Sequence, residues 1–153
     1  MPTKISRLAD FVPYLLAITS NAVSNCIAEE YYERFGLKIP EWRVMAVLGD
    51  AGALTQRDLV RAILMDKVAV NRACKALEDR GLAARTPNSR DGRSHHLQLT
   101  EAGQKIFAQV MPLTQEMYSR VFAGIEDSER EHLKRLLERI RDGVRQLEGE
   151  GGQ

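Results

Sequence analysis

Asn71, Arg72 and Lys75 have the side chains in this sequence that are best suited to reading the edges of nucleic-acid bases. Asparagine can hold an adenine edge and arginine a guanine edge through paired hydrogen bonds, and lysine reaches guanine or phosphate. On a helix, their spacing places them on one face with Val68, and Lys67 lies where that helix would begin. A helix that presents such residues from its first two turns is typical of one lying in a DNA major groove.

A second basic element is predicted further along the chain. Stretches 82–86 and 95–99 have the composition of short strands, and Asp91-Gly92 between them is a strong turn dipeptide. Arg90 and Arg93 flank this dipeptide, so the tip of the ribbon is positive. An arginine on a narrow ribbon fits an AT-rich minor groove, where the potential is most negative. The ribbon residues expected to reach DNA are Arg85, Ser89, Arg90 and Arg93.

Two short helices joined by a sharp turn are needed to hold these residues in place. Thr55 is a good N-cap for the first helix and Asp66 for the second, and Gly81 is typical of the residue that follows a helix C-terminus. At the start of the first helix, Thr55 and Gln56 are better placed for phosphate than for bases. The second helix is expected to pack inward through Val70, Ala73, Cys74 and Leu77.

The stretch from Leu54 to Thr100 resembles the winged helix-turn-helix of the MarR family of bacterial transcriptional regulators. The matching features, in order, are Leu54-Thr55-Gln56, Leu59, Asn71-Arg72, Leu77-Glu78, Arg80-Gly81-Leu82, Asp91-Gly92-Arg93 and Leu97-Gln98-Leu99-Thr100. The resemblance implies a mainly α fold with a small β-ribbon, about six helices plus a two- or three-stranded wing, in an intertwined homodimer. It also implies that Asp91 is a structural residue of the wing, which braces the ribbon against an arginine.

Further helices are predicted on both sides of this stretch. Their expected ranges are 5–35, 40–50, 101–123 and a last helix that runs to about 148. Pro13 would bend or terminate the first turn of the first helix, and Pro112 would kink the third. Ser128 with Glu131 forms a capping box that would open the last helix. The tail from Glu148 onwards is expected to be disordered.

The outer helices carry more apolar residues than one small core can cover. The stripes are Phe11, Leu15, Ile18, Ala22 and Cys26 in the first helix, and Leu133, Leu136, Leu137, Ile140, Val144 and Leu147 in the last. Packing against a second copy is the simplest solution, and wrapping of the chain's own core is the alternative. Within one MarR-type domain at 1–153, we therefore expect dimerisation helices at 5–35 and 101–148. The DNA-binding region at 38–99 would then recognise a palindromic double-stranded operator.

The composition is that of an ordinary globular protein, with 44% hydrophobic and 28% charged residues and a net charge of +1. The charge is unevenly distributed, because residues 56–105 hold ten basic and six acidic side chains, a net of +4, which leaves −3 for the rest. No apolar run approaches the roughly 18 to 20 residues of a membrane helix, and no signal peptide is evident. We expect a cytoplasmic protein with no membrane partner.

The sequence favours DNA binding over three other functions. An enzyme is disfavoured because the sequence contains no nucleophile elbow, phosphate loop or metal-protease motif. His95 and His96 would point to opposite faces of a strand, so we expect no metal site, and no cofactor. A winged helix that binds a protein without binding DNA is one alternative. A thiol-based redox-sensing regulator is another, but Cys26 and Cys74 both fall on apolar stripes and are expected to be buried.

The resemblance also implies a repressor that is released by a small ligand, such as an aromatic acid or an acyl-CoA, bound near the junction of the dimer helices and the winged domain. The polar or amphipathic residues that fall near this junction are Tyr14, Ser20, Asn21, Trp42 and Arg43. Arg43 could pair with a carboxylate. The alternative is that Trp42 belongs to the core and that Arg43 forms a surface salt bridge.

Overall fold

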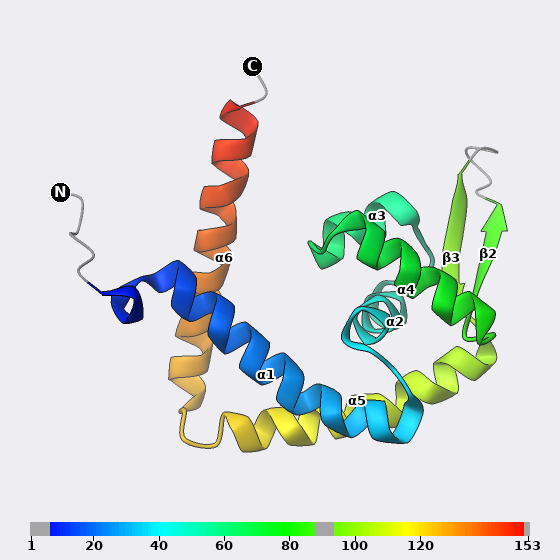
Figure 1. Cartoon of the computed structure of the whole chain (residues 1–153), viewed down its shortest axis with the longest axis horizontal. Coiled ribbons are helices and arrows are strands. Elements are labelled where there is room, and N and C mark those ends of the chain that lie inside the picture. Colours follow the sequence, from blue (N-terminus) through cyan, green and yellow to red (C-terminus); the bar gives the residue numbers. More distant parts are fainter. Residues whose placement is uncertain (1–6, 88–93, 152–153) are drawn as a thin grey trace. The chain divides into compact units, whose positions relative to one another are not determined.

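The computed structural model describes residues 7–87 and 94–151 and divides the chain into two compact units, Met1–Met117 and Tyr118–Gln153. Figure 1 shows the course of the chain through its helices and its small sheet. The elements are η1 (Leu8–Asp10), α1 (Val12–Phe35), α2 (Ile39–Ala51), β1 (Leu54–Thr55), α3 (Gln56–Ile63), α4 (Lys67–Asp79), β2 (Ala83–Pro87), β3 (His95–Leu99), α5 (Glu101–Val121) and α6 (Asp127–Glu150). The expected mainly α fold with a small β-ribbon is confirmed.

The first long helix begins at Val12, so the predicted start at residue 5 is wrong. Pro13 lies in its first turn, where a residue without a backbone N–H is tolerated because that N–H would have no helical partner. The proline therefore marks the start of α1 and does not interrupt it. The helix ends at Phe35, where Gly36 adopts a left-handed φ of 66° and donates its N–H to the Tyr32 carbonyl over 2.8 Å.

The helix-turn-helix has the boundaries that its capping residues predict. The Thr55 hydroxyl accepts the N–H of Asp58 over 3.1 Å, and the Asp66 carboxylate accepts the N–H of Val68 over 3.4 Å. Helix α4 ends in a Schellman motif in which Gly81 has a φ of 69° and the Leu82 N–H bonds to the Leu77 carbonyl over 2.9 Å. A side-chain cap therefore fixes the start of α4, and local backbone hydrogen bonds around Gly81 fix its end.

The sheet has three antiparallel strands in the order β1-β3-β2. The register pairs Leu54 with Leu97 at one side of β3 and Ala83 with Leu99 at the other. Leu97 and Leu99 are buried, whereas the intervening Gln98 is exposed, so alternate residues of β3 face the core. The wing is therefore three-stranded, with β1 drawn from the residues just before α3.

The core of the first unit lies among α2, α3, α4, the sheet and the middle of α5. Its buried hydrophobic residues are Tyr31, Leu37, Val44, Met45, Leu48, Leu59, Val70, Ala73, Cys74, Leu77, Leu82, Ala83, Leu97, Leu99 and Val110. The inward series predicted for α4 is confirmed by this set. Helix α5 approaches the end of α4 so closely that a Cβ on Gly103 would lie 2.0 Å from the Leu82 carbonyl oxygen.

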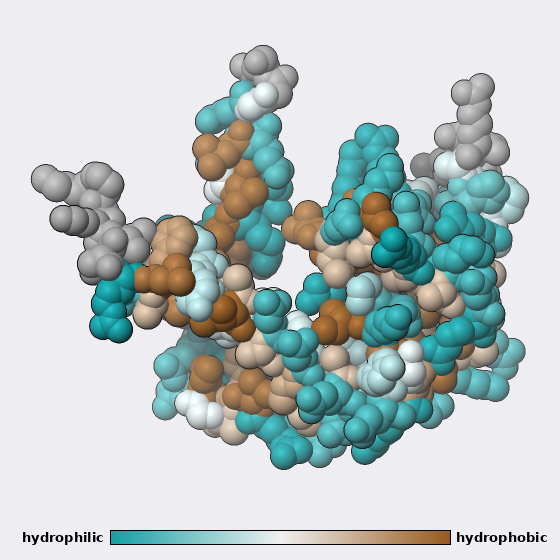
Figure 2. Space-filling view, in the orientation of Figure 1, coloured by the Kyte–Doolittle hydropathy of each residue, from teal (hydrophilic) through white to brown (hydrophobic). Residues whose placement is uncertain are grey.

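The second unit contains the end of α5 and helix α6. The cap of α6 is Glu126, whose N–H donates to the Glu129 carboxylate over 3.1 Å, so the predicted capping box of Ser128 and Glu131 is wrong. The helix runs to Glu150, and the expected disorder from Glu148 is therefore also wrong for residues 148–150. Figure 2 shows hydrophobic side chains along α6 and along the start of α1.

Candidate nucleic-acid interface

The outward face of α4 presents the predicted reading residues. Asn71, Arg72 and Lys75 are exposed on the face opposite the buried stripe, and Val68 is 50% exposed near the start of the helix. Arg72 has no hydrogen-bonding or ionic partner among the residues that the structure describes. Lys75 pairs with Asp79 over 3.1 Å in an exposed i, i+4 arrangement, which is weak and readily exchanged for another anion.

Gln56 holds Asn71 in place across the helix-turn-helix. Its side-chain Nε2 donates to Asn71 Oδ1 over 2.6 Å, which joins the first residue of α3 to the second turn of α4. This contact leaves the Asn71 NH2 group free to donate, and its carbonyl oxygen retains a second lone pair. The amide is therefore oriented and still able to form a paired contact with an adenine edge.

The ribbon is braced against α4 by an ion pair. Arg85 Nε lies 2.7 Å from Glu78 Oε1, and both side chains are partly exposed. Figure 1 shows β2 and β3 beside α4, at one edge of the first unit. Arg85 therefore has a structural partner, and its predicted contact with DNA stays a prediction. Ser89, Arg90, Asp91 and Arg93, which the sequence places at the tip, lie outside the described residues.

Helix α3 adds basic residues that the sequence analysis did not select. Arg57 and Arg61 are exposed on α3, and Lys67 is exposed at the start of α4. Together with Gln56 and Val60 they line a surface hollow of about 510 Å³. The spacing of the two arginines, four residues apart on an amphipathic helix, was the available signal. The Thr55 hydroxyl oxygen accepts the Asp58 N–H as a cap, which leaves its O–H available to donate to a phosphate.

A small hollow in the first unit contains two of the residues predicted to bind a ligand, Trp42 and Arg43. Its volume is about 180 Å³, and it is lined by Val23, Ser24, Ile27, Tyr31, Ile39, Trp42, Arg43 and Thr114. Arg43 Nη2 donates to the Ser24 hydroxyl over 3.1 Å, so its partner is not the carboxylate of a surface salt bridge. Ser24 and Thr114 were missed because α1 and α5 bring them to this place from distant parts of the chain.

Aromatic rings form one wall of this hollow. The Trp42 ring packs against Tyr31 and against Phe107, at a centroid distance of 5.9 Å in each case. Burial raises the pKa of Tyr31, so its hydroxyl stays protonated and remains a donor. Tyr14, Ser20 and Asn21 are exposed on α1 and do not line the hollow. Their proposed part in ligand binding stays a prediction.

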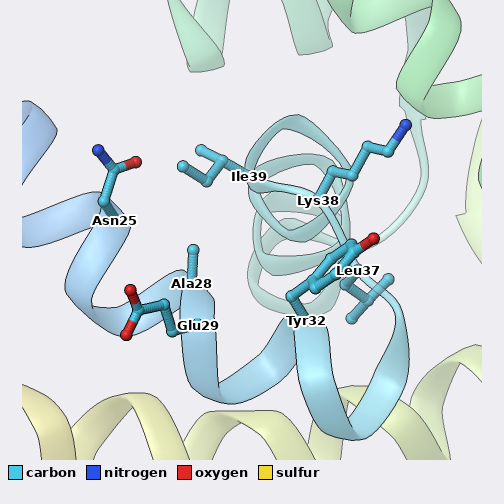
Figure 3. Close-up of a pocket in the computed structure, with 7 residues that line it drawn as sticks. All are labelled: Asn25, Ala28, Glu29, Tyr32, Leu37, Lys38 and Ile39. Atoms are coloured by element: carbon cyan, nitrogen blue, oxygen red, sulfur yellow. The ribbon is translucent and has the colours of Figure 1, made fainter.

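A second hollow lies where α1 leads into α2. Its volume is about 490 Å³, and its lining residues, shown in Figure 3, are Asn25, Ala28, Glu29, Tyr32, Leu37, Lys38 and Ile39. The lining mixes a carboxylate, an ammonium group, an amide and a phenol. This mixture favours neither anions nor cations, and none of the residues selected from the sequence lies there.

The two cysteines differ in their surroundings. Cys74 is fully buried beneath the reading face, and this burial raises the pKa of its thiol. Cys26 is exposed, so the expectation that it is buried is wrong for the single chain. Leu15 and Ile18, on the same apolar stripe of α1, and Phe11, the residue before this helix, are exposed as well among the described residues.

His95 is exposed and His96 half-buried, on neighbouring positions of β3. Within residues 7–87 and 94–151, no group of three or more His, Cys, Asp or Glu side chains could hold a metal ion. No helix in the same ranges is long and apolar enough to cross a membrane.

Comparison with known proteins gives a consistent result. The family model described as the MarR family matches residues 35–94, which include the end of α1, the helix-turn-helix and part of the ribbon. The HTH-type transcriptional repressor IacR of Pseudomonas putida is 24% identical over 132 residues, which are 86% of this chain and 78% of that protein. The crystal structure of a MarR/EmrR family transcriptional regulator from Acinetobacter sp. ADP1 matches with a TM-score of 0.85 and 25% identity, over 92% of this chain and 99% of that chain.

Three other solved structures share the fold and contain a bound molecule. A mutant of MarR from E. coli, complexed with operator DNA, matches with a TM-score of 0.75 and 22% identity over 84% of this chain and 92% of that chain. NadR in complex with 4-hydroxyphenylacetate matches with a TM-score of 0.77 and 22% identity, over 92% of this chain and 97% of that chain. CouR from Rhodococcus jostii RHA1, bound to p-coumaroyl-CoA, matches with a TM-score of 0.77 and 22% identity, over 89% of this chain and 95% of that chain.

Proposed function

Because the chain belongs to the MarR family of transcriptional regulators, we propose that it binds a double-stranded DNA operator and represses transcription until a small ligand releases it. The observation that carries this proposal is the division of α4 into two faces. Val70, Ala73, Cys74 and Leu77 anchor one face in the core, while Asn71, Arg72 and Lys75 remain exposed on the other. A rigidly anchored helix with such an outer face is suited to a major groove.

The contacts that we propose divide into two kinds. Asn71, oriented by Gln56, and Arg72, which has no described partner, are suited to read adenine and guanine edges. Lys67, Lys75 and the wing residues Arg85, Ser89, Arg90 and Arg93 are assigned to phosphates, the minor groove or both. Val68 is suited to an apolar contact with a thymine methyl group.

We further propose that two copies assemble through 5–35 and 101–148. Support comes from the apolar residues that the single chain leaves exposed at Phe11, just before α1, on α1 itself and on α6, among them Leu15, Ile140 and Val144. A two-fold dimer would present two copies of α4 to one face of the duplex. The operator would then be palindromic, with half-sites about one helical turn, roughly 34 to 36 Å, apart.

The ligand that fits the hollow at Trp42 and Arg43 is a single-ring aromatic acid. A ring would lie against Trp42 and Tyr31, and a carboxylate would accept from Arg43 in place of the Ser24 hydroxyl. The volume of about 180 Å³ is smaller than the roughly 300 Å³ at which drug-sized sites begin, which favours one ring over a larger ligand. The structural relative bound to 4-hydroxyphenylacetate agrees with this ligand class, and the relative bound to p-coumaroyl-CoA represents the larger acyl-CoA alternative.

The proposal can be tested by selecting genomic fragments with the purified protein and measuring affinity for the enriched duplex by fluorescence anisotropy. Wild type should bind specifically, and Arg72→Ala should lose base preference. Arg34→Ala, which removes an exposed arginine from α1, is the charge-matched control. Absence of any specific duplex, with the fold intact, would refute DNA binding and favour a protein-interaction module.

The ligand is tested separately by thermal shift with single-ring aromatic acids and with p-coumaroyl-CoA. An acid that stabilises the wild-type protein should weaken operator binding. The reason is that a ligand shifts an equilibrium only through its differential affinity for the two states. Arg43→Met should abolish the stabilisation without changing operator affinity in the absence of ligand. A response to oxidants alone, lost in a Cys26→Ser, Cys74→Ser variant, would instead establish thiol-based regulation.

A further inference from the structure

Gln56 connects the core of the first unit with the reading face of α4. Its Nε2 donates to Asn71 Oδ1 over 2.6 Å, which is short for an N–H···O hydrogen bond. At its inner side it approaches Cys74, which is fully buried. Burial raises the pKa of the Cys74 thiol, and the nearby Gln56 side chain opposes that rise. One side chain therefore extends from a buried residue to an exposed residue that is proposed to read a base.

The oxygen of the same amide is in an unfavourable place. Gln56 Oε1 is buried and has no hydrogen-bond partner among the residues that the structure describes. A buried carbonyl oxygen without a partner costs free energy, whereas an apolar side chain of similar size would avoid that cost. Stability therefore does not account for an amide at this position. What the amide adds is the hydrogen bond from its nitrogen to Asn71.

The direction of this hydrogen bond decides which half of the Asn71 amide is free. Asn71 is exposed, and its Oδ1 already accepts the Gln56 N–H. Because the two halves of a planar amide diverge, the NH2 group is directed away from Gln56 and remains free to donate. Asn71 therefore presents a donor, with only the second lone pair of Oδ1 left to accept. Beside a residue that could only accept, Asn71 would have to turn its NH2 group inward and present its oxygen.

The bases differ in what they offer to such a group in the major groove. Guanine presents the acceptors N7 and O6, cytosine presents the N4 amino donor, and adenine presents both a donor and an acceptor. A free NH2 group matches guanine or adenine and opposes cytosine, because two donors then face each other. A free carbonyl oxygen matches cytosine or adenine and opposes guanine. The choice between guanine and cytosine therefore reports which half of Asn71 faces the base.

We propose that Gln56 sets the base specificity of Asn71 by occupying its oxygen, so that the operator position read by Asn71 carries an acceptor and excludes cytosine. This inference rests on the proposed function and deepens it. Gln56 is then a positioning residue, which selects a base without contacting that base. The proposal also gives a reason for the buried Oε1 without a partner, because the nitrogen of the same amide is needed at Asn71.

The test uses three variants that differ in what the side chain at residue 56 can offer. Affinity is measured by fluorescence anisotropy for the selected duplex with guanine or cytosine at the position where Asn71→Ala loses discrimination. Lysine can only donate, so Gln56→Lys should keep the several-fold preference of wild type for guanine. A carboxylate can only accept, so Gln56→Glu should reverse the preference. Leucine does neither, so Gln56→Leu should bring the ratio close to one without lowering the urea midpoint of unfolding.

A control separates hydrogen-bond direction from charge. Gln56→Glu makes the net charge more negative by one, and Arg57→Gln makes the same change at the next residue of α3, which is exposed. Arg57→Gln should change the affinity for both duplexes alike and keep the preference for guanine. Retention of that preference in Gln56→Glu, or its reversal in both variants, would overturn the proposal. A wild-type preference for cytosine would overturn it as well.

The outcomes also distinguish this inference from the proposed function. If wild type binds no specific duplex, the proposed function fails, and if Asn71→Ala loses discrimination at no position, the assignment of Asn71 fails. If Asn71→Ala loses discrimination at one position and all three Gln56 variants keep the wild-type ratio there, only the role of Gln56 is refuted. Equal relaxation of the ratio in all three variants would also refute it, because Gln56 would then be needed for its shape alone.

Discussion

The guanidinium of Arg80, at the end of α4, donates to the backbone carbonyl of Phe35, at the end of α1, over 2.7 Å. Its other terminal nitrogen lies 3.4 Å from the Gly36 carbonyl. Carbonyls at a helix C-terminus lack helical partners and carry partial negative charge, so a cation there is favourable. One side chain thus connects the reading helix with the helix proposed to form the dimer.

We predict that Arg80→Ala lowers the free energy of unfolding by about 1 kcal/mol, because a forked donor to two carbonyls is lost. Arg80→Lys should recover only part of this, since lysine lacks the fork. Urea denaturation measures both. Arg34→Ala, which breaks an exposed i, i+4 pair with Glu30, should cost no more than about 0.5 kcal/mol. Equal losses at both sites would show that the bridge contributes nothing specific.

We predict that Gln56 and Asn71 act as a unit in reading DNA. Asn71→Ala should reduce discrimination at one base position by about 1 to 3 kcal/mol. Gln56→Ala should reduce discrimination at the same position, because the Asn71 amide loses the contact that orients it. A double-mutant cycle by anisotropy on single-base operator variants should then show strong non-additivity. Additive effects at two different positions would mean that the residues contact DNA independently.

We predict that Cys74 is unreactive in the folded protein. Burial raises the pKa of its thiol, so the thiolate fraction at neutral pH falls below that of an exposed cysteine, and the thiolate is the reactive species. In a Cys26→Ser background, reaction with a disulfide reagent should be slow in buffer and complete in denaturant. Rapid native labelling at pH 7 would instead support a redox-sensing role for this thiol.

We predict that Gly103→Ala is destabilising by about 1 to 3 kcal/mol, the usual range for overpacking. Its Cβ would lie 2.0 Å from the Leu82 carbonyl oxygen, which is backbone and cannot rotate away. Gly149→Ala is the control, because no described atom lies within 4 Å of a Cβ there, the residue lies off the apolar stripe of α6, and alanine favours a helix. Thermal unfolding should show opposite shifts. Similar behaviour of the two variants would mean that α5 moves aside easily.

We predict that the exposed stripe of α6 holds the dimer together. Sedimentation equilibrium of wild type should give about twice the 17.2 kDa of one chain. Ile140→Asp should lower this mass towards that of a monomer, because it places a charge among apolar residues proposed to be covered by a second copy. Glu138→Ala, on the other face of the helix, should not. A wild-type protein that sediments as a monomer would refute the proposed assembly.

The sequence predicted those parts of the molecule that local chemistry determines. Thr55, Asp66 and Gly81 define helix ends through contacts with near neighbours, and the buried stripe of α4 follows from spacing alone. The start of α6 was mispredicted because two pairs of residues share the capping-box spacing. Ser128 with Glu131 has the more favourable residue types, but the helix uses Glu126 with Glu129.

Features that depend on distant segments were beyond sequence reasoning. The hollow at Arg43 needs Thr114 from α5 and Ser24 from α1, and the contact between Gln56 and Asn71 depends on how two helices cross. The exposure of Cys26 has a different cause. The apolar spacing on α1 is real, but the described residues leave that half of the helix exposed, so a rule that equates apolar spacing with burial fails there.

Strand β1 has a consequence for protein engineering. Thr55 caps α3 with its side chain and pairs with His96 of the wing through its backbone, and Leu54 pairs with Leu97. The ribbon and the helix-turn-helix therefore share residues and are not separate modules. A chimaera that exchanges only 83–99 for the wing of another regulator would place a foreign β3 against the native Leu54-Thr55. Residues 54 and 55 would therefore have to be exchanged together with residues 83–99, so that β1 still pairs with β3 and α3 keeps its N-cap.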